Sequence, residues 1–423
     1  MRRLLGWLAL VVIVLAGAGT AWALRHGEID AIAEASPPDP DEVARGAQLA
    51  AVGGCASCHG EDLSGGTALP TPFGTIHSTN ITPDRETGLG TWSAEAFRRA
   101  MREGVDREGK YLYPAFPYDN FTHATDTDLD AIYAYLQSIP AVPHAPTSNT
   151  LGFPYNIRLL LAGWNTLFLT PGPLEPVADQ NEVWNRGAYL AESLGHCQAC
   201  HTPRNAFGAM KTSAAYAGAM VEGWWSPALD GSGTTPAGWS EEELINYFYD
   251  GWDANHGIAA GPMAEVVGNV STLPEEDVTA LAVYVASLAG PVAADADRTA
   301  AFDTAAQTAL ASGETPEETG NAVLDHGAEV FVARCVNCHR SGSETVPLAY
   351  ASAVTGPHPE NFLHVVLNGI TPTENAYFVR PMPGFAQLPD EDISALAQFV
   401  RERFTDGQEW SVTPADVAEI RAE

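Results

Sequence analysis

The chain has 423 residues, which is too long for one ordinary hydrophobic core and predicts two to four domains. Hydrophobic residues make up 45% of it, as in folded globular proteins, and this composition excludes a largely disordered chain. The 53 acidic and 21 basic residues give a formal charge of -32, which argues against nucleic acid as a partner. Such a surface fits a basic docking partner, and equally a generally acidic or salt-adapted proteome.

The N-terminal segment places two arginines before an uncharged apolar run, Leu4 to Leu24, that is long enough to span a bilayer. A cleaved signal peptide is the alternative, since Ala21-Trp22-Ala23 resembles a small-x-small cleavage site. We favour a retained transmembrane helix because the run is longer than the core of a usual signal peptide. The two arginines should stay in the cytoplasm, so the chain after Arg25 is expected on the other side of the membrane.

All six cysteines fall in Cys-x-x-Cys-His motifs, so none remains for a disulfide bond. A single motif would fit a redox dithiol or half of a zinc site. Zinc would need a second ligand pair nearby in sequence, and a dithiol has no use for a neighbouring histidine three times over. Covalent haem explains every motif residue, because the thiols add to the vinyl groups and the histidine binds the iron. The sequence therefore predicts three covalently bound haem c groups, at Cys55, Cys58 and His59, at Cys197, Cys200 and His201, and at Cys335, Cys338 and His339.

Covalent haem attachment by this motif takes place outside the cytoplasmic membrane in bacteria. This agrees with the orientation expected from the N-terminal arginines. We therefore expect a protein of the bacterial cytoplasmic membrane, with an N-terminal anchor and its haem domains in the periplasm.

Aligned on the three motifs, the chain shows a repeated module. Each motif follows a helix-like stretch that opens with glycine, and each module closes with an amphipathic helical stretch whose first turn is acidic. In small c-type cytochromes the first and last helices cross beside the haem, where a small residue on one receives an aromatic residue from the other. We expect this contact, which supports the fold and not the function, at Gly46 with Tyr135, Gly187 with Tyr284, and Gly327 with Phe399.

The predicted fold is all-α, with three tandem class I cytochrome c-like domains after one transmembrane helix. The Pro- and acid-rich stretch before the first module and the Ala-, Thr- and Glu-rich stretch before the third are interpreted as spacers. The division is an anchor or signal at 1–25, a linker at 26–42, domain one at 43–142, a hydrophobic linker at 143–178, domain two at 179–292, a linker at 293–320, domain three at 321–410 and a polar tail at 411–423.

The hydrophobic linker contains the sequence YNIRLLLAGWNTLFLTPG, with a single charge. Three interpretations stay open: it packs between the first two modules, lies in the membrane interface, or docks a partner subunit.

A proximal histidine leaves one axial position on each iron, and a methionine there raises the reduction potential relative to a second histidine. Met263 in AAGPMAEVV and Met382 in VRPMPGFAQL lie in proline-flanked loops before the closing helices of domains two and three. A methionine is more often a core residue, but these two occupy matching places. We predict both as axial ligands.

Domain one has Phe116 at the matching place, in YPAFPY, and phenylalanine cannot bind iron. Met101, which we expect in the core, His123 in a polar turn and the more distant His77 are the alternatives. A vacant sixth position is the remaining option. We predict that the first haem is vacant or bound by a non-homologous side chain.

Prolines follow each haem motif, at positions 70, 203 and 347. A backbone carbonyl there would accept the ring hydrogen of the proximal histidine. Simple loop rigidity explains the prolines equally well.

The phrases GGCASCHG, TPFGTIHSTNITPDRETGLGTWS, LYPAFPY, GHCQACHTPRNAFGAM, AGPMAEVV and MPGF together resemble the tri-haem cytochrome c subunits of membrane-bound bacterial dehydrogenases. The resemblance covers residues 43 to 405. Alcohol, gluconate and aldehyde dehydrogenases have such subunits, and the N-terminal segment and the YPAFPY phrase look most like the branch that accompanies molybdenum hydroxylases. Many members of the alcohol dehydrogenase branch have methionine where Phe116 stands, so that ligand cannot be carried over.

The resemblance implies that the chain transfers electrons from a catalytic subunit, a molybdenum hydroxylase, quinoprotein or flavoprotein, to ubiquinone, a cytochrome or a terminal oxidase. No dinucleotide fingerprint or P-loop is visible, so we expect a non-catalytic electron-transfer subunit whose partner oxidises the substrate. The alternatives are a peroxidase-like haem enzyme and a gas or redox sensor, either of which would use an open first haem. His123 is the obvious acid-base residue for an enzyme.

Overall fold

The computed structural model describes residues 22, 24–33, 37–291, 294–311, 319–340, 345–373, 375, 379–406 and 409–422. The predicted anchor, Leu4 to Leu24, lies almost entirely outside these ranges. None of the helices within them is long and apolar enough to cross a membrane. The chain divides into two compact units, Met1–Pro176 with Glu192–His196 and Ala206–Ala209, and Val177–Ala191 with Cys197–Asn205 and Met210–Glu423.

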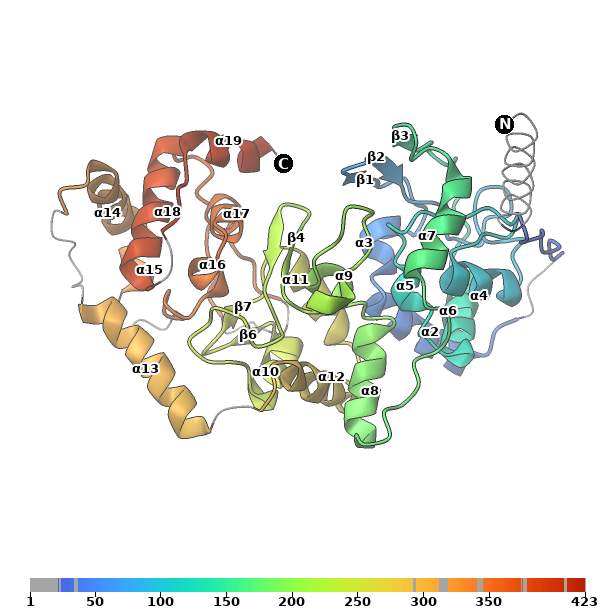
Figure 1. Ribbon diagram of the computed structural model, residues 1–423, viewed down its shortest axis with the longest axis horizontal. Helices are drawn as coiled ribbons and strands as arrows, with labels where there is room; N and C mark the ends of the chain where they lie inside the picture. The colour runs from blue at the N-terminus through green and yellow to red at the C-terminus, as the bar shows by residue number, and fades with distance from the viewer. Residues whose placement is uncertain are drawn as a thin grey trace, which may run out of the picture. The chain divides into compact units, whose positions relative to one another are not determined.

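The first unit holds domain one and the hydrophobic linker (Figure 1). The first and last helices of domain one, α2 and α6, pack against each other and contribute much of its core. The elements are α2 (Pro40–Val52), α3 (Cys55–His59), β1 (Ala68–Thr71), β2 (Gly74–His77), α4 (Ala94–Glu103), α5 (Tyr118–Phe121), α6 (Asp126–Ser138), β3 (Thr150–Leu151), the 3-10 helix η1 (Arg158–Leu160) and α7 (Leu161–Phe168).

The second unit holds most of domain two and all of domain three. Domain two consists of α8 (Glu182–Glu192), α9 (Gln198–His201), η2 (Thr212–Ala214), β4 (Ala219–Val221), β5 (Trp224–Ser226), α10 (Glu241–Asp250), β6 (Trp252–Asp253), β7 (Gly257–Ile258), α11 (Pro262–Val270) and α12 (Glu275–Leu288). The chain continues through α13 (Asp295–Ala311) into α14 (Ala322–Arg334), α15 (Val336–His339), α16 (Ser352–Thr355), α17 (Glu360–Asn368), α18 (Asp390–Phe404) and α19 (Pro414–Ala422).

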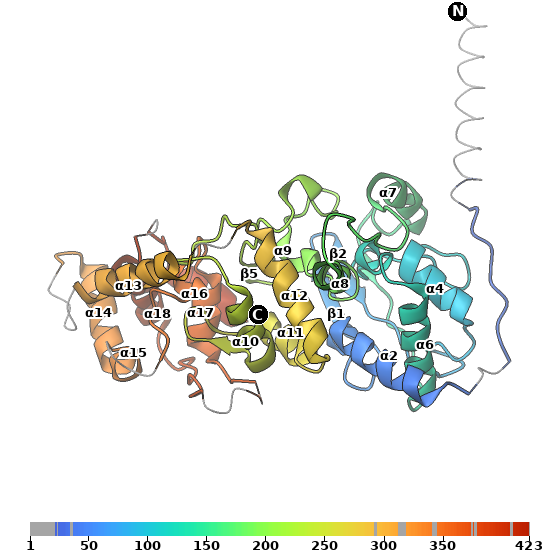
Figure 2. The same cartoon turned by 90° about the horizontal axis from the view of Figure 1, so that it is seen from below.

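The predicted glycine contacts between first and last helices are confirmed in all three domains. A Cβ added to Gly46 would lie 1.9 Å from the carbonyl oxygen of Ala131 and 2.9 Å from the Cβ of Tyr135. Figure 2 shows α2 and α6 in this crossing. Added Cβ atoms at Gly187 and Gly327 would meet their aromatic partners, Tyr284 and Phe399, at 2.7 Å. Any side chain at these positions would force the helices apart.

A hydrogen-bonded pair beside each glycine repeats at the matching place in the three domains. In domain one the Nε of Arg45 donates to Asp128 at 2.8 Å, and in domain two Arg186 donates to Asp277 at 2.6 and 2.7 Å. His326 takes the place of arginine in domain three, with its Nε2 2.8 Å from Asp392. The pairs fix the axial register of the two helices, because each joins the residue before the glycine to the last helix.

The domains are mostly helical, and the all-α prediction missed three small antiparallel sheets, β1-β2-β3, β4-β5 and β6-β7. Each strand is two to four residues long, too short to show the alternation that marks a strand in sequence. Gly74, at a φ of +126°, begins β2 directly after the two-residue turn from β1.

The hydrophobic linker packs against other parts of the first unit, to which it belongs. The Nε1 of Trp164 donates to the carbonyl of Phe207 at 3.0 Å, and the hydroxyl of Tyr118 donates to Asn165 at 2.7 Å. Other apolar side chains of the linker stay exposed, including Phe153 at 81% and Leu167 at 74%. The linker thus contacts domain one and residues 206–209 while keeping an apolar outer surface.

Two segments contain helices that the sequence analysis did not predict. The spacer at 293–320 contains α13, whose Arg298 and Phe302 are buried. The polar tail from 411 is α19, with Val417 fully buried against the core of domain three. In both helices only a few of the described residues are buried, on one face. The other residues are mostly polar or alanine, so the sequence shows no clear apolar periodicity.

Candidate haem centres

Each Cys-x-x-Cys-His motif forms one short helical turn that ends at its histidine. In α3 the turn runs from Cys55 to His59, whereas Cys197 and Cys335 stand directly before α9 and α15. Two cysteines and a histidine on a single turn face one side of the chain. This is the geometry that lets one porphyrin take both thioether bonds and the axial imidazole.

The predicted proximal histidines of domains one and two each bond a backbone carbonyl through Nδ1. The distance is 2.5 Å from His59 to Thr79 and 2.7 Å from His201 to Pro227. A carbonyl oxygen only accepts, so Nδ1 must carry the proton and Nε2 keeps its lone pair for iron. The fold thereby selects the tautomer that a haem requires.

The predicted proline carbonyls are not these acceptors. The carbonyl of Pro203 accepts from the Lys211 amide at 2.8 Å instead. The true acceptors lie 20 and 26 residues after the histidines, where the hairpins β1-β2 and β4-β5 bring the chain back. A sequence offers no fixed spacing by which to find such a partner.

Burial lowers the pKa of His59 and of His201 below the ordinary histidine value, and the carbonyl bonds only partly oppose it. Burial also lowers the pKa of His339. All three rings are therefore neutral at physiological pH, as metal ligation demands. The Nδ1 of His339 is buried, and no residue in the part of the chain that the structure describes accepts its hydrogen bond.

The motif thiols lie in apolar surroundings. Burial raises the pKa of Cys55 to about 12 and that of Cys335 to about 11, with the neighbouring motif cysteine adding to each shift. A redox dithiol needs the opposite, a thiol pKa below its usual range. The environment therefore fits thioether attachment of haem and argues against a thioredoxin-like role.

In domains one and two, the same backbone hydrogen bond closes the loop that carries the candidate axial residue. In domain one the amide of Leu112 donates to the carbonyl of Gly104 at 2.7 Å, and in domain two Ala259 donates to Gly251 at 2.8 Å. Both glycines end a helix in the left-handed conformation. Four residues beyond this bond stand Phe116 and Met263, so the structure makes the two positions equivalent.

Domain three closes its loop with a pair of bonds between Ile370 and Met382, at 2.9 and 3.0 Å. Both predicted methionine ligands are half-buried: Met263 lies in the first turn of α11, and Met382 packs at the edge of the domain core. Neither side chain is fully enclosed by protein atoms.

Met101 is 5% exposed and belongs to the core of domain one with Phe97 and Phe121. It lies three residues before the helix-ending glycine, where domain two has the buried Phe248. A phenylalanine at the equivalent place indicates that Met101 fills core volume. Phe116 packs against the same core, with its ring centroid 5.4 Å from that of Phe121.

The two histidines considered for the first haem lie in different settings. The Nδ1 of His123 bonds the carbonyl of Gly172 at 3.0 Å, and its own carbonyl accepts from Leu174, so His123 fastens the hydrophobic linker. His77 lies on β2, where its Nδ1 is buried and has no hydrogen-bond partner among the described residues.

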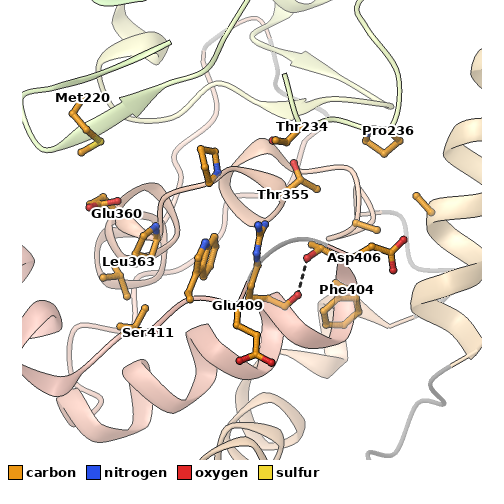
Figure 3. A pocket seen from close by; sticks show the side chains of 18 of the residues that line it. Met220, Thr234, Pro236, Thr355, Glu360, Leu363, Phe404, Asp406, Glu409 and Ser411 are labelled. Carbon is orange, nitrogen blue, oxygen red and sulfur yellow. Dashed lines mark hydrogen bonds between the residues drawn. The ribbon is translucent and has the colours of Figure 1, made fainter. Parts of the chain in front are cut away.

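A cleft of about 1350 Å³ opens elsewhere in the second unit, between the β4-β5 hairpin, α13 and domain three (Figure 3). Met220, Glu360, Phe404 and Glu409 line it. None of the predicted haem ligands contributes to this lining, so the cleft is separate from the haem motifs.

Comparison with known proteins bears out the domain type. A family model described as cytochrome c matches residues 43–140, and one described as cytochrome c oxidase, cbb3-type, subunit III matches residues 322–400. One subunit of the nicotinate dehydrogenase of Pseudomonas putida is 44% identical over 391 residues. That match covers 89% of this chain and 32% of the relative, so the chain spans about a third of that protein's length.

Two further relatives match along most of both sequences. The fructose dehydrogenase cytochrome subunit of Gluconobacter japonicus is 35% identical over 90% of this chain and 82% of its own length. The gluconate 2-dehydrogenase cytochrome c subunit of Pantoea cypripedii is 35% identical over 90% of this chain and 89% of its own. With its haem-attachment turns and mostly helical domains, the chain belongs to the family of electron-transferring cytochrome c subunits of dehydrogenase complexes.

Proposed function

We propose that the chain is a membrane-anchored, periplasmic tri-haem cytochrome that takes electrons from a separate catalytic dehydrogenase subunit. It passes them to the respiratory chain, to ubiquinone, a cytochrome or a terminal oxidase. The similarity to the nicotinate dehydrogenase subunit favours a molybdenum hydroxylase as the donor. The chain binds and positions the haems and sets their potentials, and the haems carry the redox change.

The observation that carries this proposal is the match along more than four fifths of two dehydrogenase cytochrome subunits. The three attachment turns support it, because each presents two thiols and a histidine together. Haem c supplies one-electron transfer between its ferric and ferrous states. The carbonyls of Thr79 and Pro227 hold the ring proton of His59 and His201, which keeps Nε2 free for iron.

Ligation differs among the three haems in this proposal. Met263 and Met382 complete histidine-methionine ligation in domains two and three. The first haem has no thioether at Phe116 and is vacant or bound by another side chain. Its potential and reactivity should therefore differ from those of the other two.

Purification from the native membrane tests the assignment. We expect the chain to co-purify with a larger oxidoreductase subunit, to contain three covalent haems, and to be reduced when the partner's substrate is added. A His339→Ala variant should lose ligation in domain three while domains one and two still take up electrons. Isolation as a stable single polypeptide that reduces peroxide at a useful rate would contradict the subunit assignment and favour a haem enzyme.

A further inference from the structure

Domains two and three of the second unit meet at two adjacent tryptophans on β5. The backbone of Trp225 makes two bonds with the side chain of Asn361 on α17, each 2.8 Å long. Neighbouring residues of a strand face opposite sides, so Trp224 and Trp225 make different contacts. The Trp225 ring lies 4.5 Å from that of His358. The main-chain bonds join the domains without using either indole.

Trp224 stacks on His364 of α17. The ring centroids are 4.4 Å apart and the planes differ by 11°. The Nε2 of His364 donates to the carbonyl of Gly223 at 3.2 Å, and His364 is only 6% exposed. The stack is therefore held by a hydrogen bond and by burial as well as by ring contact.

On the side of domain two, Trp224 packs against the loop of the candidate ligand Met263 and lies on the strand that leads to the hydrogen-bond partner of His201. A Cβ added to Gly261 would lie 2.6 Å from the Trp224 ring, and Gly261 precedes the candidate ligand Met263 by two residues. The same strand leads to Pro227, whose carbonyl holds the ring proton of His201. Trp224 is thus in contact with one ligand loop and close in sequence to the support of the other.

On the side of domain three, His364 belongs to the helix that holds the methionine loop. α17 ends at Asn368, and Ile370, two residues later, pairs with Met382 through both backbone bonds. The amide of Phe385 also donates to the carbonyl of Val366 at 2.8 Å. The contacts therefore form a continuous path from the Met263 loop through the two stacked rings to the Met382 loop.

We propose that Trp224 and His364 are positioning residues that couple the second and third haems for electron transfer. This rests on the proposed function, which places a haem in each domain. The rate of electron tunnelling falls steeply with distance and is higher through atoms in contact than across a gap. One iron goes from ferrous to ferric as the other goes from ferric to ferrous, while the two rings are neither oxidised nor protonated.

Photochemical injection of one electron into domain three tests the coupling without any partner protein. Every native cysteine is used in haem attachment, so a Glu329→Cys thiol on α14 is a unique site for a ruthenium photosensitiser. The Glu329 side chain is 83% exposed. Freeze-quench EPR, which separates the haems, then follows the electron from the third haem to the second.

We expect Trp224→Leu to slow this step by about tenfold or more, which corresponds to about 1.4 kcal/mol of activation free energy. Haem content and midpoint potentials should stay unchanged, and Trp224→Phe should restore most of the rate. Trp225→Leu is the matched control, because it removes an indole from the same junction and leaves the stack and the main-chain bonds to Asn361 in place.

An unchanged rate in Trp224→Leu, or an equal loss in Trp225→Leu, would overturn the proposal. If Trp224→Leu fails to retain haem, the pair His364→Leu and His364→Phe decides in the same way, with only the leucine variant expected to be slow. A wild-type chain without three haems would instead refute the proposed function, so the two failures are distinguishable.

Discussion

At the scale of single residues, Phe116 has the greatest chemical consequence. Its loop closes with the same backbone bond as the loop of Met263, so the two side chains occupy equivalent places. The sequence alone predicted this equivalence, because the flanking prolines and the following helix mark the position. It could not identify Thr79 and Pro227 as the partners of the proximal histidines, since those contacts depend on how the hairpins return.

Substituting Phe116→Met should therefore complete a third histidine-methionine haem. We expect the methionine-to-iron charge-transfer absorption to rise from two units per chain to three, and the first haem potential to increase. Met101→Leu is the control: a volume-conserving core change that costs less than about 1.5 kcal/mol and leaves the wild-type spectrum intact. Loss of a unit in Met101→Leu would show that Met101 binds the first iron.

At the scale of secondary-structure elements, the crossing of the first and last helices fixes how each domain packs. The aromatic and glycine positions were predictable because both recur at fixed places around each motif. The strands, α13 and α19 were not, because their stability comes from tertiary contacts. Arg298 of α13, for example, is buried where the carboxylate of Glu243 on α10 and the carbonyl of Gly238 accept its hydrogen bonds.

Gly187→Ala tests the crossing in domain two. The new methyl group would lie 1.9 Å from the carbonyl oxygen of Ala280, and such overpacking should cost about 1–3 kcal/mol of unfolding free energy. Gly268→Ala in α11 is the matched control. A Cβ there meets no atom within 4 Å, so it should stabilise the helix by about 0.5–1 kcal/mol. Denaturant unfolding measures the change in unfolding free energy for each variant. Equal changes in Gly187→Ala and Gly268→Ala would contradict the close contact at Gly187.

At the scale of the whole molecule, a buried polar cluster joins domain two to the connection with domain three. Glu243 accepts from Arg298 and from Asn255, and lies 3.3 Å from His256. Further along α13, Phe302 packs in a buried cluster with Tyr350. The hydroxyl of Tyr350 donates a hydrogen bond to the backbone carbonyl of Phe302 at 2.9 Å. The segment predicted as a spacer therefore forms a helix that packs against both domains of the second unit.

The stability of this junction should depend on pH. Burial by itself raises the pKa of Glu243, but bonds from His256, the Ser240 amide and Asn255 outweigh it and hold the pKa below the usual carboxyl range. A depressed carboxyl pKa contributes stability above the unfolded value of 4.5, and this stability is lost as the pH falls below it. Glu243→Gln should thus cost about 3 kcal/mol at neutral pH, because it leaves Arg298 buried without its counter-ion.

The difference between wild type and Glu243→Gln should shrink as the pH is lowered from about 4.5, measured by denaturant unfolding across a pH series. Asp130→Asn breaks a half-exposed pair with Arg98 and should cost less than about 1 kcal/mol, which makes it the control. If the difference in unfolding free energy between wild type and Glu243→Gln grew as the pH fell, the depressed pKa of Glu243 would be contradicted.

The loop-closing bonds at Gly104 and Gly251 have a consequence for how the haems of domains one and two can differ. The same main-chain bond forms whether the residue four places on is phenylalanine or methionine, so the loop does not need its ligand in order to fold. In the proposed function, one substitution in this loop would change the ligation of the iron and keep the backbone bond that closes the loop. On that proposal, the reduction potential of each haem can be changed by its own loop residue, separately from the fold of the domain.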